Sequence, residues 1–101
     1  MSKIRVFIKE PFEPGHKATI SNTLPNLQNI VGGYIETYSI GSDFTIICNE
    51  EGRLLGLPRN CKLFDQVFVG TIIIAGIDGE EFSSCPLSTE ECLELIERGT
   101  L

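Results

Sequence analysis

The feature that most constrains the fold is the apolar run VFVGTIIIAGI at residues 67–77. The run is about half as long as a membrane-spanning helix must be, so we interpret it as part of a soluble core. Its many residues branched at Cβ favour a strand over a helix. Because neither side of the run is polar, both faces of the strand should be covered. We therefore predict a buried strand over 67–76, at the centre of a sheet.

Segments with alternating apolar and polar residues supply the partners of this strand. In KIRVFIKE (3–10) the apolar residues fall on one face and the basic residues on the other, as in a half-buried strand. Pro14-Gly15 fits the centre of a type II turn, so HKATIS (16–21) should return as the second strand of a hairpin. A second hairpin is predicted from YIETYSI (34–40) and FTIICN (44–49), joined by Gly41-Ser42-Asp43.

Two short helices are predicted from their capping residues. SNTLPNLQNIVGG begins at an N-cap, Asn22 or Thr23, and ends at Gly32-Gly33, where glycine adopts a positive φ at low cost. Near the end of the chain, Ser88 and Glu91 have the spacing of a capping box. This second helix should run to Arg98 and Gly99, and it must pack on the sheet because so short a helix is unstable alone.

These elements predict an α+β fold. With 101 residues, the chain is long enough for one domain, and we assign 1–101 to it. We expect a mixed or antiparallel sheet of about five strands in ββαββ-β-α order, with one short helix and the C-terminal helix packed on it. The order is compatible with a β-grasp-like arrangement. The directions of the strands remain open.

The charge of the chain restricts its partners. The formal net charge is −6, with 14 acidic and 8 basic residues, so direct binding of nucleic acid is not expected and a charged partner should be basic. Seven of the acids lie between residues 78 and 97 and suit a solvated helix surface. Nothing near the N-terminus resembles a signal peptide, so we expect a cytoplasmic protein that does not enter a membrane.

The residue chemistry predicts neither a catalytic site nor a metal or cofactor site. No two of the four cysteines have the CxxC spacing, and the single histidine, His16, is distant from them in sequence. The cysteines are Cys48, Cys61, Cys85 and Cys92. We expect buried, neutral thiols instead. The paired acids, such as Glu50 and Glu51, are adjacent, so on a strand they would point to opposite faces and could not act together.

A surface for a ligand is the remaining candidate site. Guanidinium and amide groups around GLP at 56–58 could bind phosphate or carboxylate, and tyrosines at alternate positions of one strand could stack on a ligand. Alternatively, the tyrosines cover the core and the arginines neutralise nearby acids. The candidate ligand-binding residues are Tyr34, Glu36, Tyr38, Asn49, Arg53, Arg59 and Asn60.

Three segments carry a resemblance to a known family. VGGYIE (31–36), CNEEGRLLGLPRN (48–60) and GTIIIAGIDGEEFSS (70–84) resemble the signature of small proteins of bacteriophages, plasmids and gut Firmicutes that are classified as a domain of unknown function. The resemblance covers roughly residues 25–98.

The resemblance implies an accessory protein of a phage or mobile element that binds without catalysis and modulates a host process or a host defence. One alternative is a module that sequesters a small nucleotide-like ligand through an Arg/Asn/Tyr pocket. A second alternative is a hydrolase with scattered acidic residues. The oligomeric state is open.

Overall fold

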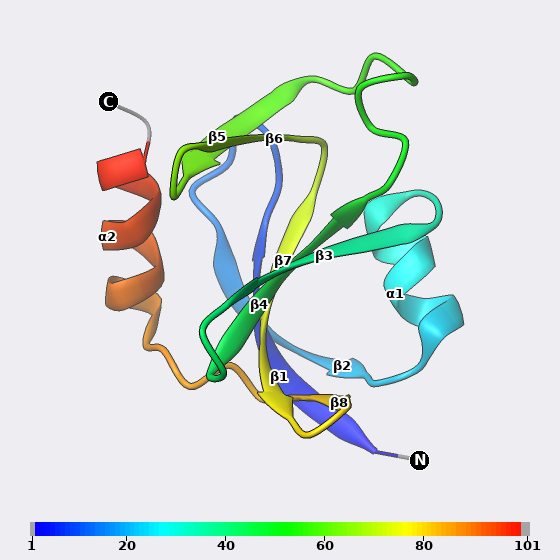
Figure 1. Ribbon diagram of the computed structural model, residues 1–101, viewed down its shortest axis with the longest axis vertical. Helices are drawn as coiled ribbons and strands as arrows, with labels where there is room; N and C mark the ends of the chain where they lie inside the picture. Colours follow the sequence, from blue (N-terminus) through cyan, green and yellow to red (C-terminus); the bar gives the residue numbers. More distant parts are fainter. Residues whose placement is uncertain (1, 100–101) are drawn as a thin grey trace.

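The computed structural model describes residues 2–99 and contains a six-stranded sheet (Figure 1). Five strands lie in the order β2-β1-β7-β4-β3, β8 pairs with β7, and all these pairings are antiparallel. The α+β class and the central position of the apolar strand are therefore confirmed. The strands are β1 (Lys3–Lys9), β2 (His16–Ser21), β3 (Ile35–Ile40), β4 (Phe44–Asn49), β7 (Ile72–Asp78) and β8 (Glu81–Ser83).

The predicted strand over 67–76 is wrong in one respect, because Gly70 divides it. Gly70 has φ +71, which ends β6 (Gln66–Val69) before β7 begins. Its N–H donates to the Pro58 carbonyl at 2.8 Å, and a Cβ at Gly70 would lie 2.7 Å from Leu57 Cδ1. β6 pairs with β5 (Arg59–Leu63) in a separate two-stranded sheet, and β5 was not predicted from the sequence.

The end of the central strand also differs from the prediction. The turn at Asp78-Gly79-Glu80-Glu81 leads into the short β8, which pairs back on β7 with Asp78 opposite Glu81. The order of elements is thus ββαββββββα in the described residues. The adjacent strands β1 and β7 are antiparallel, whereas a β-grasp fold has a parallel pair of strands at this place. The β-grasp-like arrangement is therefore wrong for this sheet.

The sheet has a hydrophobic core on each face, because successive side chains of a strand point to opposite sides. The helix α1 (Leu24–Val31) lies on one side of the sheet, and α2 (Thr89–Gly99) lies on the other (Figure 1). In β7, Ile73 and Ala75 belong to the core cluster that includes α1, whereas Ile72 and Ile74 belong to the cluster that includes α2 and the β5–β6 hairpin. Both faces of β7 are therefore buried, which explains why isoleucines point to either side of this strand.

The predicted capping residues are found at the ends of the helices. Thr23 is the N-cap of α1, since its hydroxyl accepts from the Asn26 N–H at 3.3 Å, and Gly32 ends the helix with φ +84. At α2, the Glu91 N–H donates to Ser88 Oγ at 3.1 Å, and the Ser88 N–H donates to Glu91 Oε1 at 3.0 Å. The capping box is confirmed. The side chain of Arg98 lies outside the described residues.

The turn between β5 and β6 carries backbone strain. Phe64 and Asp65 have φ +49 and +66, a conformation that suits Asn-Gly far better than a bulky residue. We expect Phe64→Asn to raise the free energy of unfolding by about 1 kcal/mol, because it relieves this strain. Denaturant unfolding would measure the gain. Leu54→Asn is the control, since Leu54 is also exposed but has no positive φ; an equal gain there would contradict the explanation.

Candidate functional site

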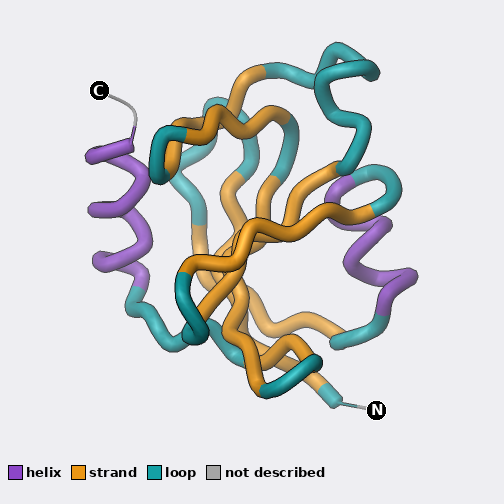
Figure 2. Tube along the Cα trace, in the orientation of Figure 1, coloured by secondary structure: helices purple, strands orange, loops and turns teal. Residues whose placement is uncertain are grey.

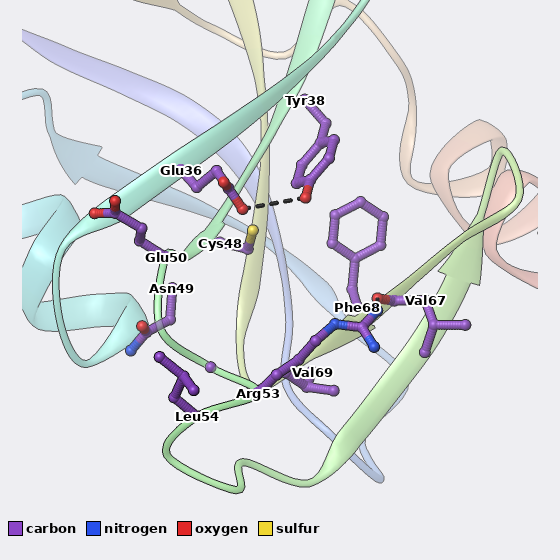
Figure 3. Close-up of a pocket in the computed structure, with 11 residues that line it drawn as sticks. Glu36, Tyr38, Cys48, Asn49, Glu50, Arg53, Leu54, Val67, Phe68 and Val69 are labelled. Atoms are coloured by element: carbon purple, nitrogen blue, oxygen red, sulfur yellow. Dashed lines mark hydrogen bonds between the residues drawn. The ribbon is translucent and has the colours of Figure 1, made fainter.

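A cavity of about 390 Å³ lies between the β3–β4 hairpin and the β5–β6 hairpin (Figure 3). This volume falls within the range usual for small-ligand sites. The connection of residues 50–58, drawn as a loop in Figure 2, closes one side of the cavity. The residues that line it are Glu36, Tyr38, Cys48, Asn49, Glu50, Gly52, Arg53, Leu54, Val67, Phe68 and Val69.

The turn at Asn49 directs the chain away from β4 and so creates the cavity. Asn49 at the first position and Gly52 at the last are the residue pattern of a type I turn, and the Gly52 N–H donates to the Asn49 carbonyl at 3.3 Å, the hydrogen bond expected in such a turn. The Asn49 side chain accepts from the Glu51 N–H at 2.8 Å and donates to the Val31 carbonyl at 3.2 Å. Its amide thus joins the turn to the end of α1. At Gly52 a Cβ would lie 2.8 Å from Val69 Cγ2, so the wall at this point requires glycine.

Two aromatic rings and a carboxylate lie next to one another in the lining of the cavity. The Tyr38 hydroxyl donates to Glu36 Oε1 at 3.1 Å, and the Tyr38 and Phe68 rings pack edge to face with centroids 5.2 Å apart (Figure 3). The hydrogen bond to Glu36, with a contribution from burial, raises the pKa of Tyr38. Tyr38 therefore stays protonated at neutral pH, and the carboxylate has a fixed donor beside it.

Arg53 brings the positive charge of the site. Its Nη2 donates to the Val67 carbonyl at 2.8 Å, which holds the side chain against β6. The positive charge of Arg53 acts to lower the pKa of Tyr38, although the effects that raise this pKa are larger. The guanidinium is therefore close enough to the phenol to influence its ionisation. An arginine has five N–H donors, and a ligand can use those that the Val67 carbonyl does not.

The cysteine in the cavity is not a ready nucleophile. Burial, reinforced by the charge of Glu36, raises the pKa of Cys48 to about 11. Thiolate, the reactive form, is therefore scarce at neutral pH. All four cysteines are free and buried, as predicted. For Cys61, too, burial raises the pKa to about 11.

The structure brings four of the seven candidate ligand-binding residues together: Glu36, Tyr38, Asn49 and Arg53 line the cavity. Tyr34 and Arg59 do not. Tyr34 is 66% exposed on the turn before β3, and Arg59 is exposed on β5. Val67, Phe68 and Val69, which also line the cavity, were not predicted because β6 was interpreted as part of the central strand. In the β3–β4 hairpin Glu36 is directly opposite Cys48, so the predicted hairpin could have indicated that this thiol lies beside the carboxylate.

The side chain of Asn60, the seventh candidate, makes hydrogen bonds within the fold and not with the cavity. Its Nδ2 donates to the carbonyls of Lys9 and Gly70, each at 2.7 Å, and its Oδ1 accepts from Lys9 Nζ at 3.0 Å. Lys9 is buried and also donates to the Glu10 carbonyl. Asn60 therefore anchors the β5–β6 hairpin to β1, and both of its amide donors are used.

Within residues 2–99, a metal site or a membrane-spanning helix would be a further indication of function. This part of the chain contains no group of three or more histidine, cysteine or acidic side chains that could hold a metal ion. Neither of its two helices has the length and apolar content needed to cross a membrane.

The fold and the cavity define a small antiparallel α+β domain with a polar and aromatic pocket between its sheet and a separate hairpin. The family described as "Domain of unknown function (DUF3846)" matches residues 4–99, and the chain belongs to this family. No curated protein and no solved structure matches the chain.

Proposed function

We propose that this protein is a non-enzymatic binding protein whose binding site is the cavity between the two hairpins. The observation that carries this proposal is the set of groups in the cavity: Arg53, Glu36 and the Tyr38–Phe68 ring pair can recognise a ligand. Specific recognition typically combines apolar walls with a few polar groups in fixed positions.

The protonation states of Cys48 and Tyr38, which line the cavity, favour binding over catalysis. Cys48 is held as a thiol, and Tyr38 as a phenol that already donates to Glu36. His16 lies on β2, at the opposite edge of the sheet from β3. No imidazole therefore reaches the thiol to activate it, as nucleophilic cysteines require.

A protein is the partner that the surroundings of the cavity favour. Leu54 lines the cavity and is 87% exposed, and the adjacent Leu55 is 60% exposed. Large apolar side chains exposed beside a cavity are typical of protein interfaces. Together with the resemblance to proteins of phages and plasmids, this supports a role in modulating a host protein, for example in host defence.

A small nucleotide-like ligand is the second candidate, and Arg53 favours it. The guanidinium keeps donors beyond the one bound to Val67, and the Tyr38 and Phe68 rings offer surfaces on which a base could stack. Both candidates place the ligand in the same cavity.

Arg53→Ala tests the site, with Arg59→Ala as its matched control because Arg59 lies outside the cavity. Affinity purification from lysate of the natural host cell, followed by native mass spectrometry, should yield one stoichiometric partner with the unmodified protein. We expect Arg53→Ala to weaken this binding at least about tenfold, as loss of an interface arginine commonly does. Arg59→Ala should bind normally.

The mass of the complex separates the two candidates. A bound host protein supports the first, and an added mass of a few hundred daltons supports the second. Equal losses in Arg53→Ala and Arg59→Ala, or a chain that carries no partner at all, would contradict the assignment of the cavity.

A further inference from the structure

Two cysteines outside the cavity lie side by side near the beginning of α2. Cys85 Sγ and Cys92 Sγ are 4.0 Å apart, and either thiol can donate to the other. Cys85 lies in the connection between β8 and α2, where its N–H donates to the Arg5 carbonyl at 2.8 Å. Cys92 lies in α2, one residue beyond the capping box. The pair therefore joins the beginning of α2 to a segment that is hydrogen-bonded to β1.

The environment of this pair differs from that of the other two cysteines. The hydrogen bond with Cys92 lowers the pKa of Cys85 and correspondingly raises that of Cys92. Lys17 also favours the thiolate form of both, and Glu91 opposes it. Burial raises the pKa of all four thiols, but for Cys48 and Cys61 it is the largest cause, and no second thiol contributes. The chain thus contains one pair of thiols in mutual contact and two isolated thiols that can serve as controls.

We propose that Cys85 and Cys92 form a redox-active dithiol that a peroxide converts into an intramolecular disulfide. The sulfur atoms must approach from 4.0 Å to the usual bond length of about 2.05 Å. The side chains stand on two segments that already pack together, so rotation of one or both thiols shortens the distance.

The reaction balances with hydrogen peroxide as the oxidant. The Cys85 thiolate attacks one peroxide oxygen, the O–O bond breaks, and hydroxide leaves, giving a sulfenic acid. The Cys92 sulfur then attacks the sulfenic sulfur, and the hydroxyl leaves as water with the thiol proton. Overall, two thiols lose two electrons and two protons, and one peroxide becomes two molecules of water.

The disulfide should tighten the attachment of α2. It closes a short loop through the residues between Cys85 and Cys92, and such a crosslink restricts the unfolded chain. We expect the melting temperature to rise by roughly 5 to 15 °C on oxidation. The cavity between the hairpins does not include either cysteine, so this property is separate from the proposed binding function.

Peptide mapping of the unmodified protein tests the pair without any substitution. Trypsin cleaves after Lys62 and Arg98, so Cys85 and Cys92 fall on one peptide (63–98), whereas Cys61 and Cys48 fall on others. After treatment with hydrogen peroxide and then iodoacetamide, peptide 63–98 should be unalkylated and about 2 Da lighter than its reduced form. Dithiothreitol should restore both thiols and the original melting temperature.

Single variants identify the sulfurs that react. Cys85→Ala and Cys92→Ala should each abolish the loss of mass and the rise in melting temperature, and Cys48→Ala and Cys61→Ala should retain both. The proposal is overturned if peptide 63–98 stays fully alkylated after oxidation. It is equally overturned if the disulfide joins this peptide to one that carries Cys48 or Cys61.

Discussion

Gly76→Ala is expected to destabilise the protein by about 3 to 5 kcal/mol, a large part of the roughly 5 to 15 kcal/mol available to a domain of this length. A Cβ at Gly76 would overlap the carbonyl oxygen of Ser84 and lie 2.7 Å from Ser83 Oγ. Both neighbours belong to the segment that follows the β7–β8 turn, and the obstruction includes backbone. The methyl group could enter only if this segment moved.

The segment that would move is fastened to β1. The Arg5 N–H donates to Ser84 Oγ at 3.0 Å, and the Arg5 carbonyl accepts from the Cys85 N–H at 2.8 Å. Displacing residues 83–85 would break these bonds and disturb the start of α2. Denaturant unfolding of Gly76→Ala would measure the loss.

Gly41→Ala is the control for the effect of adding a methyl group to a glycine. Gly41 has φ +63, and a Cβ there would meet nothing within 4 Å. Only the conformational cost of about 1 kcal/mol should appear. If Gly76→Ala cost no more than Gly41→Ala, steric contact at Gly76 would not be the reason for the glycine.

Asn60→Ala is the second substitution with a large expected effect, a loss of about 3 kcal/mol of stability. It removes two hydrogen bonds to the carbonyls of Lys9 and Gly70 and one from the Lys9 ammonium group. Lys9 is only 8% exposed, so its charge would remain buried with one partner fewer. Removing one member of a buried polar network costs more than an average hydrogen bond.

The neighbouring Arg59→Ala should change the free energy of unfolding by less than about 0.5 kcal/mol, because Arg59 is exposed. Chemical denaturation of the two variants side by side provides the measurement. An Asn60→Ala protein of unchanged stability that no longer bound its partner would restore Asn60 as a ligand-binding residue.

The sequence predicted the grouping of candidate residues most directly where one strand carries them. Glu36 and Tyr38 alternate along β3, so a period of two places both on one face, and the structure puts both in the cavity. Arg53 and Asn60 have similar polar chemistry, and both lie near the same GLP sequence. Arg53 lines the cavity while Asn60 is fully used between β1 and the hairpin. Distant carbonyls decide this difference, and sequence spacing does not contain them.

The division of the apolar run at Gly70 shows the same limit for the fold. Val67, Phe68 and Val69 have the composition of a buried strand, and so have residues 72–75. The break between them depends on the Leu57 side chain, which leaves no room for a Cβ at Gly70, and on the hydrogen bond from the Gly70 N–H to the Pro58 carbonyl. Glycine permits a positive φ but does not require one.

Features that arise from neighbouring residues could be predicted from the sequence: the N-cap and glycine end of α1, the capping box of α2, the turn at Asn49, and the burial of 72–75 on both faces. These follow from local hydrogen bonds and from side-chain periodicity, which need no knowledge of the rest of the chain. The strand order, the separate β5–β6 hairpin, the cavity and the contact of Cys85 with Cys92 became visible only in the three-dimensional fold. Each of these depends on contacts between segments far apart in the chain or on the position of a whole element.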